Sequence, residues 1–75
     1  NSDLQKKYPE KQYAYLNYGT YYFNINKTDS LIYNFEIAVE FGCVNPQVID
    51  YLHQYYTKKG DAKKASIYYN LLKNN

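Results

Sequence analysis

The residues of this 75-residue chain that are best suited to chemistry are one cysteine, one histidine and a pair of glutamates. A structural zinc site takes four nitrogen, sulfur or oxygen ligands, so the single thiol of Cys43 and the single imidazole of His53 do not suffice. We therefore expect neither a metal nor another cofactor. Glu36 and Glu40 share one helix face at a spacing of four, and paired carboxylates can carry out acid–base catalysis. No glycine-rich phosphate loop or nucleophile elbow accompanies them. The sequence therefore predicts that the chain is not an enzyme.

Each of these reactive side chains also has a plain structural interpretation. His53 has the chemistry of a pH switch, but a packed or surface histidine is the commoner case. Cys43 has the chemistry of a redox sensor, but a small apolar residue in a turn is the default. A lysine cluster would suit acidic partners or phosphate, although a solvated face is the commoner outcome. The cluster consists of Lys58, Lys59, Lys63 and Lys64.

Charge and composition argue against several classes of partner. The net charge is +2 and arginine is absent, so the chain lacks the side chain best suited to grip phosphates. Nucleic-acid binding is therefore not expected, even though two of the 12 tyrosines, Tyr13 and Tyr21, lie where they could stack on bases. No apolar run approaches the roughly 20 residues that cross a bilayer, so membrane insertion is not expected. With no signal-peptide pattern, the cytoplasm is favoured, but the compartment is not fixed.

Proline and glycine divide the chain into segments of helical length. Pro9, Pro46 and Gly60 mark the breaks. We predict four helices over residues 11–25, 28–41, 46–59 and 62–74, joined by turns short enough to make neighbours antiparallel. Asn45 before Pro46 and Asp61 after Gly60 are expected to cap helices. Thr28 or Asp29 is expected to cap the helix that begins near residue 28.

Within these segments apolar residues recur every three or four positions, as on the buried face of an amphipathic helix. Tyr13 and Tyr21 fall off this pattern. The predicted internal stripes are Tyr15, Tyr18, Tyr22 and Ile25; Leu31, Phe35, Ala38 and Val39; Ile49, Leu52, Tyr55 and Tyr56; and Ala65, Tyr68, Tyr69 and Leu72.

A shift of 34 residues aligns the chain with itself. Six apolar positions coincide, and the turn at Asn26-Lys27 falls on Gly60-Asp61. The six pairs are Tyr15 with Ile49, Tyr18 with Leu52, Tyr22 with Tyr56, Leu31 with Ala65, Phe35 with Tyr69 and Ala38 with Leu72. This recurrence predicts two copies of a helix–turn–helix unit.

The period and the motif resemble those of the tetratricopeptide repeat. Tyr15-x₂-Tyr18-Gly19-x₂-Tyr22 matches the W-x₂-L-G-x₂-Y pattern of the first helix of that repeat, and Leu31-x₃-Phe35 occupies its A-x₃-F positions. The second copy reads Ile49-x₂-Leu52-His53-x₂-Tyr56 and then Ala65-x₃-Tyr69. His53 stands in the glycine position, where a small residue lets the two helices approach. It must therefore widen the gap or point outward.

The resemblance implies one all-α domain, a short right-handed solenoid of antiparallel helical hairpins. Residues 12–45 would form one repeat and residues 46–75 a second, slightly truncated one. Cys43 stands where the family has a proline, and Pro9 lies one period earlier. Residues 1–8 would then be the helical tail of a preceding repeat. All of residues 1–75 would therefore belong to one repeat domain.

The family holds a peptide or helix of a partner protein in a concave groove lined by the first helix of each repeat. By resemblance, the first repeat would contribute Tyr13, Leu16, Asn17, Thr20 and Asn24. The second repeat would contribute Gln47, Asp50, Tyr51, Gln54 and Lys58. The expected function is therefore a non-catalytic protein-binding scaffold.

Ile67 and Leu71 support an alternative in which the chain associates with itself. They lie four apart on the last predicted helix, off its internal stripe. In a longer array another helix would cover them. A repeat cut from a larger array, which we favour, a homodimer or a tolerated exposed patch would each account for them.

Overall fold

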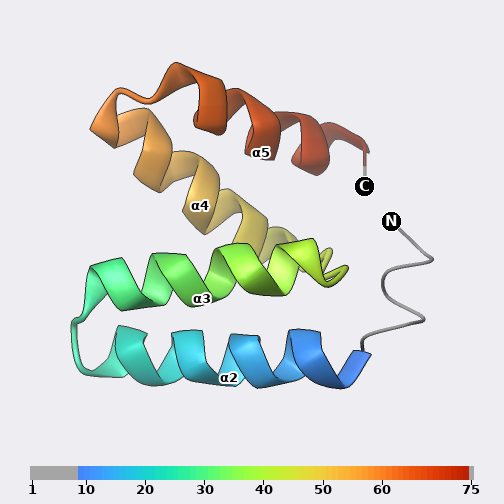
Figure 1. Ribbon diagram of the computed structural model, residues 1–75. Coiled ribbons are helices and arrows are strands. Elements are labelled where there is room, and N and C mark those ends of the chain that lie inside the picture. The colour runs from blue at the N-terminus through green and yellow to red at the C-terminus, as the bar shows by residue number, and fades with distance from the viewer. Residues whose placement is uncertain (1–8, 75) are drawn as a thin grey trace. The chain divides into compact units, whose positions relative to one another are not determined.

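The computed structural model describes residues 9–74 of the chain, and this part is helical without strands. Its helices are α2 (Pro9–Asn24), α3 (Thr28–Glu40), α4 (Pro46–Lys59) and α5 (Ala62–Asn74), as Figure 1 shows. The four predicted helices and the all-α class are confirmed, with two ends moved by one residue and one by two. The expected helical tail over residues 1–8 lies outside the described residues.

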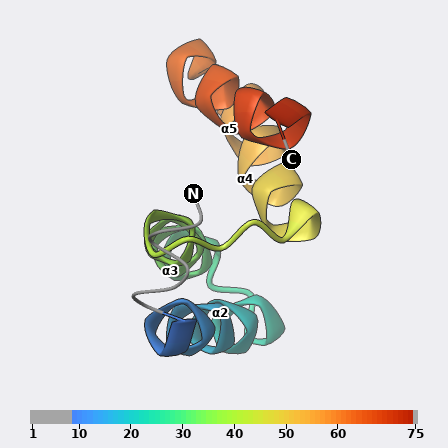
Figure 2. The same ribbon diagram turned by 90° about the vertical axis from the view of Figure 1, so that its right-hand side faces the viewer.

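The helices form two compact units, each a pair of helices packed against each other. The first unit ends at Cys43 and contains α2 and α3, and the second begins at Val44 and contains α4 and α5. In both views the members of each pair lie side by side (Figures 1 and 2). The short turns between α2 and α3 and between α4 and α5 produce these hairpins, as expected for antiparallel neighbours. A single stacked domain over residues 1–75 stays a prediction.

The turn of the first hairpin is closed by a left-handed residue after α2. Asn26 has φ 61°, a conformation that asparagine tolerates better than most residues. The Lys27 N–H donates to the Tyr22 carbonyl at 2.9 Å, and the Asn26 N–H donates to the Phe23 carbonyl at 3.2 Å. These two bonds are those of the Schellman motif, which satisfies the last carbonyls of a helix.

The turn of the second hairpin repeats this geometry 34 residues later. Gly60 has φ 86°, which glycine adopts without a steric penalty. The Asp61 N–H donates to the Tyr56 carbonyl at 3.0 Å, and the Gly60 N–H donates to the Thr57 carbonyl at 3.2 Å. The predicted coincidence of the two turns is therefore confirmed at the level of backbone hydrogen bonds.

Two of the predicted helix caps are confirmed. The Asn45 side chain accepts a hydrogen bond from the Gln47 N–H at 2.9 Å, and Pro46 follows at the first helical position of α4. At the start of α5 the Asp61 carboxylate accepts from the Lys64 N–H at 3.1 Å. Each cap satisfies an amide that would otherwise lack a partner inside the helix.

The predicted cap of α3 is wrong. Lys27 occupies the cap position without a side-chain hydrogen bond, and Thr28 is already helical. Lys27 corresponds to the capping Asp61 in the second hairpin. We expect Lys27→Asp to raise the free energy of unfolding by about 0.5–2 kcal/mol, because it adds a cap and a favourable charge at the helix N-terminus. Urea unfolding followed by circular dichroism measures this, with Lys27→Leu as the control that removes only the charge.

The core of each unit is formed by apolar residues at helical spacing. Buried residues of the first unit are Leu31, Ile32, Ala38 and Cys43, and those of the second are Val48, Ile49, Leu52, Tyr56, Ala65 and Tyr68. In the second unit the rings of Tyr56 and Tyr68 stack with their centroids 6.0 Å apart, joining α4 to α5. Burying such rings removes a large apolar area from water.

Three residues of the predicted internal stripes lie on the surface instead. Tyr18 is 55% exposed, Tyr69 is 49% exposed and Ile25 is 42% exposed. Tyr13 and Tyr21, expected to fall off the stripe, are exposed as predicted. Helical spacing fixes which residues share a face, but it does not tell whether another element covers that face.

Gly19 and His53 occupy equivalent positions in the two hairpins, but they pack differently. A Cβ atom at Gly19 would overlap the Phe35 ring, so the first hairpin requires a residue without a side chain. In the second hairpin His53 faces α5, where its Nδ1–H donates to the Ala65 carbonyl at 3.1 Å and its ring lies 5.7 Å from that of Tyr69. Tyr69 is the counterpart of Phe35. Of the two expected alternatives for His53, pointing outward is therefore wrong, because its ring is turned toward α5.

Candidate partner-binding surfaces

The five predicted contact residues of the first hairpin share one face of α2. The helical period places their side chains in one stripe that is about three turns long. The stripe consists of Tyr13, Leu16, Asn17, Thr20 and Asn24. Leu16 is half-buried and the other four are exposed. The Thr20 hydroxyl donates to the Leu16 carbonyl at 2.9 Å, so its oxygen remains available as an acceptor. This face offers amides, a hydroxyl and one exposed phenol ring.

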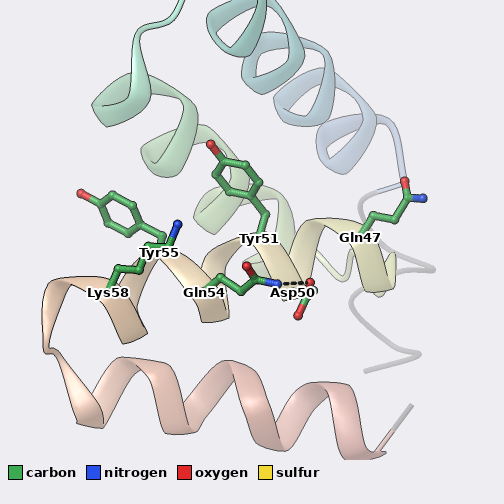
Figure 3. Close-up of a pocket in the computed structure, with 6 residues that line it drawn as sticks. All are labelled: Gln47, Asp50, Tyr51, Gln54, Tyr55 and Lys58. Atoms are coloured by element: carbon green, nitrogen blue, oxygen red, sulfur yellow. Dashed lines mark hydrogen bonds between the residues drawn. The ribbon is translucent and has the colours of Figure 1, made fainter.

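The predicted contact residues of the second hairpin line one shallow depression on α4. Figure 3 shows them with a sixth lining residue, Tyr55. The predicted five are Gln47, Asp50, Tyr51, Gln54 and Lys58. Side chains at spacings of three and four lie above one another on a helix, and the depression is therefore a continuous strip along α4.

The strip carries opposite charges at its two ends. Asp50 is near one end and accepts a hydrogen bond from the Gln54 amide at 2.8 Å (Figure 3). Lys58 lies eight residues further on, about 12 Å along the helix axis. The Tyr51 and Tyr55 rings lie between them and are half-buried. The arrangement suits a segment with an apolar side chain in the middle, a basic group near Asp50 and an acidic group near Lys58.

Tyr55 belongs to this strip but was predicted to be internal. Its hydroxyl accepts a hydrogen bond from Lys59 Nζ at 3.3 Å, and the same nitrogen lies 5.3 Å from the ring centroid. The spacing of four from Tyr51 was the signal that could have found it. Lys59 therefore orients the ring and brings a second positive charge to the Lys58 end.

The two residues proposed for self-association are exposed on α5. Ile67 is 50% exposed and Leu71 is 36% exposed. Their spacing of four puts them on one side of the helix. The pair forms a small apolar surface, well within what single-chain proteins tolerate.

The histidine and the cysteine noted in the sequence both lie in structural surroundings. Cys43 is a buried free thiol, and His53 is engaged with α5. Within residues 9–74, no three histidine, cysteine, aspartate or glutamate side chains group as metal ligands would. None of the helices in that range combines the length and the apolar character that a membrane crossing needs.

Comparison of the chain with models of protein families, with curated proteins and with solved structures gives no match.

Proposed function

We propose that the chain is a non-catalytic protein-binding module whose two hairpins stack as a short right-handed solenoid of the tetratricopeptide type. The support is the 34-residue recurrence, which extends from the apolar pattern to the turn geometry at Asn26 and Gly60. A hairpin of this kind buries only part of its apolar surface by itself, and stacking supplies the rest.

The partner in this proposal is a peptide or helix of another protein, held in a concave groove lined by α2 and α4. The observation that carries it is the strip on α4, where Asp50, Tyr51, Gln54 and Lys58 meet around one depression. Tyrosine rings contribute much contact area at a small loss of conformational entropy. The charges at the two ends favour one direction of the bound segment.

The test is a peptide selected against the protein. A displayed library of random peptides would be selected on the 75-residue chain, and the best peptide measured by calorimetry against variants. We expect Tyr51→Ala to weaken binding at least about ten-fold, because aromatic anchors dominate such interfaces. Asn17→Ala and Lys58→Gln should weaken it less. The selected peptides should carry a basic residue and an acidic residue on opposite sides of an apolar one.

Ser66→Ala is the matched control, since Ser66 is exposed on α5 and lies outside both faces. Circular dichroism should show unchanged helicity for every variant. Normal binding by both Tyr51→Ala and Asn17→Ala would refute the assignment of the groove.

Self-association through Ile67 and Leu71 is the alternative function, and their exposure on α5 favours it. Light scattering on the same samples separates the two proposals. A monomer at all concentrations supports the groove, whereas a stable dimer that Ile67→Lys with Leu71→Lys dissociates would support self-association.

A further inference from the structure

A second candidate site lies on the first hairpin, away from the predicted groove. Its tyrosines, at positions 15, 18 and 22 of α2, lie roughly half a turn around the helix from Tyr13 and Asn17. They face a hollow that α3 closes from the other side. The lining residues are Tyr15, Tyr18, Tyr22, Asp29, Ser30, Tyr33 and Asn34.

Two of these rings line the hollow with their planes steeply inclined to each other. The centroids of Tyr15 and Tyr18 are 5.8 Å apart and their planes meet at 74°. Tyr15 is held in this orientation by Phe41, whose ring stacks on it at 5.9 Å. Tyr18 and Tyr33 are 55% and 66% exposed, so the hollow is open to a ligand.

The hollow has the electrostatics of a cation site. Asp29 is the only charged side chain in the lining. Residues 9–43 carry four carboxylates and two lysines, so the described part of this hairpin is negative. The face of an aromatic ring is also negative and attracts cations within about 6 Å of its centroid. A cation in the hollow would therefore meet attraction from both the rings and the carboxylate.

The protein already pairs ammonium groups with aromatic rings in this way. Lysine nitrogens lie 5.1–5.6 Å from ring centroids in four pairs elsewhere in the described part of the chain. These pairs are Lys11 with Phe41, Lys59 with Tyr55, Lys64 with Tyr56 and Lys73 with Tyr69. Among residues 9–74, no lysine is paired in this way with a ring of the hollow, and the exposed rings of Tyr18 and Tyr33 are accessible to a cation from outside.

We propose that this hollow binds the trimethylammonium group of a methylated lysine on a partner protein. A bare ammonium is strongly hydrated, so an open hollow competes poorly with water for it. Methylation weakens that hydration and leaves the charge, which is the combination that aromatic cages recognise. Phosphocholine carries the same cation, but its phosphate would lie near Asp29 without a cation in the lining to balance it.

The test is a nuclear magnetic resonance titration of the full 75-residue chain with an acetylated, amidated trimethyl-lysine. We expect saturable shifts at residues around the hollow. The isostere in which carbon replaces the charged nitrogen has the same shape without the charge. It should bind at least about five-fold more weakly. Phosphocholine should also bind more weakly than trimethyl-lysine.

Two variants connect the binding to the hollow. Tyr18→Leu and Asp29→Asn should each weaken trimethyl-lysine binding at least about three-fold, with helicity preserved because both residues are exposed. Glu40→Gln is the matched control, since Glu40 is an exposed carboxylate on α3 that does not line the hollow. It should bind as the original chain does.

The proposal is overturned if the neutral isostere binds equally well, or if Tyr18→Leu and Asp29→Asn leave the affinity unchanged. Tighter binding of phosphocholine would overturn it in favour of a lipid headgroup. The proposal is also overturned if light scattering shows a dimer that trimethyl-lysine does not dissociate. The occupant of the hollow would then be a second copy of the chain. None of these outcomes depends on peptide binding to the α4 strip.

Discussion

Replacing Leu52 with alanine is expected to lower the free energy of unfolding by about 2–5 kcal/mol. Leu52 has no exposed surface, so the substitution leaves a cavity as well as removing apolar contacts. A chain of this length has a total stability of only about 0.05–0.15 kcal/mol per residue. The variant should therefore be partly unfolded at room temperature, which urea titration and thermal melting by circular dichroism will detect.

Tyr18 provides the matched comparison, because it occupies the same position in the other hairpin but is 55% exposed. We expect Tyr18→Ala to reduce stability by less than about 1 kcal/mol, as surface substitutions usually do. Equal losses for the two variants would mean that the difference in burial between the hairpins does not exist in solution.

The second large effect is expected for Gly19→His, which gives the first hairpin the residue that the second one carries. The Phe35 ring already occupies the space in which a Cβ at Gly19 would lie. Forcing a side chain into a packed interface typically costs about 1–3 kcal/mol. We expect a loss near the upper end of this range, measured by urea unfolding, because imidazole is much larger than a methyl group.

A double-mutant cycle tests whether Phe35 is the cause. In a Phe35→Leu background the ring is gone, so Gly19→His should cost at least about 1 kcal/mol less than in the original chain. Asn17→His controls for histidine itself, since Asn17 is exposed on the same helix. A cost that is the same in both backgrounds would show that the ring does not limit this position.

In the first hairpin, the two proposed sites use opposite faces of α2. Tyr13, Asn17 and Thr20 would contact a peptide on one face, and Tyr15 and Tyr18 form part of the hollow on the other. A partner with a methylated lysine beside its bound segment could engage both faces at once. Such linked contacts raise the overall affinity beyond that of either site.

The local backbone could be predicted from the sequence. Pro46 and Gly60 marked helix ends, Asn45 and Asp61 were recognised as caps, and the structure confirms all four. These signals act within a few residues, through a fixed φ, a side-chain acceptor or freedom from a Cβ clash. Gly42, with φ 104° after α3, carried the same kind of signal and was overlooked.

The grouping of five residues on one face of α4 could be predicted for a similar reason, while their role in binding stays a prediction. Gln47, Asp50, Tyr51, Gln54 and Lys58 were placed on one face by the helical period, and a helix maintains that period whatever surrounds it. The resemblance to a known repeat selected which face to consider. The structure brings all five around one depression.

Only the tertiary structure decided which equivalent positions are buried and how the two hairpins differ inside. Leu52 and Tyr18 occupy the same place in the repeat, yet one is buried and the other exposed. His53 fits where Gly19 is required, because the Ala65 carbonyl and the Tyr69 ring receive it. Local sequence sets the direction of a side chain, whereas burial and spacing depend on residues far along the chain that pack against it.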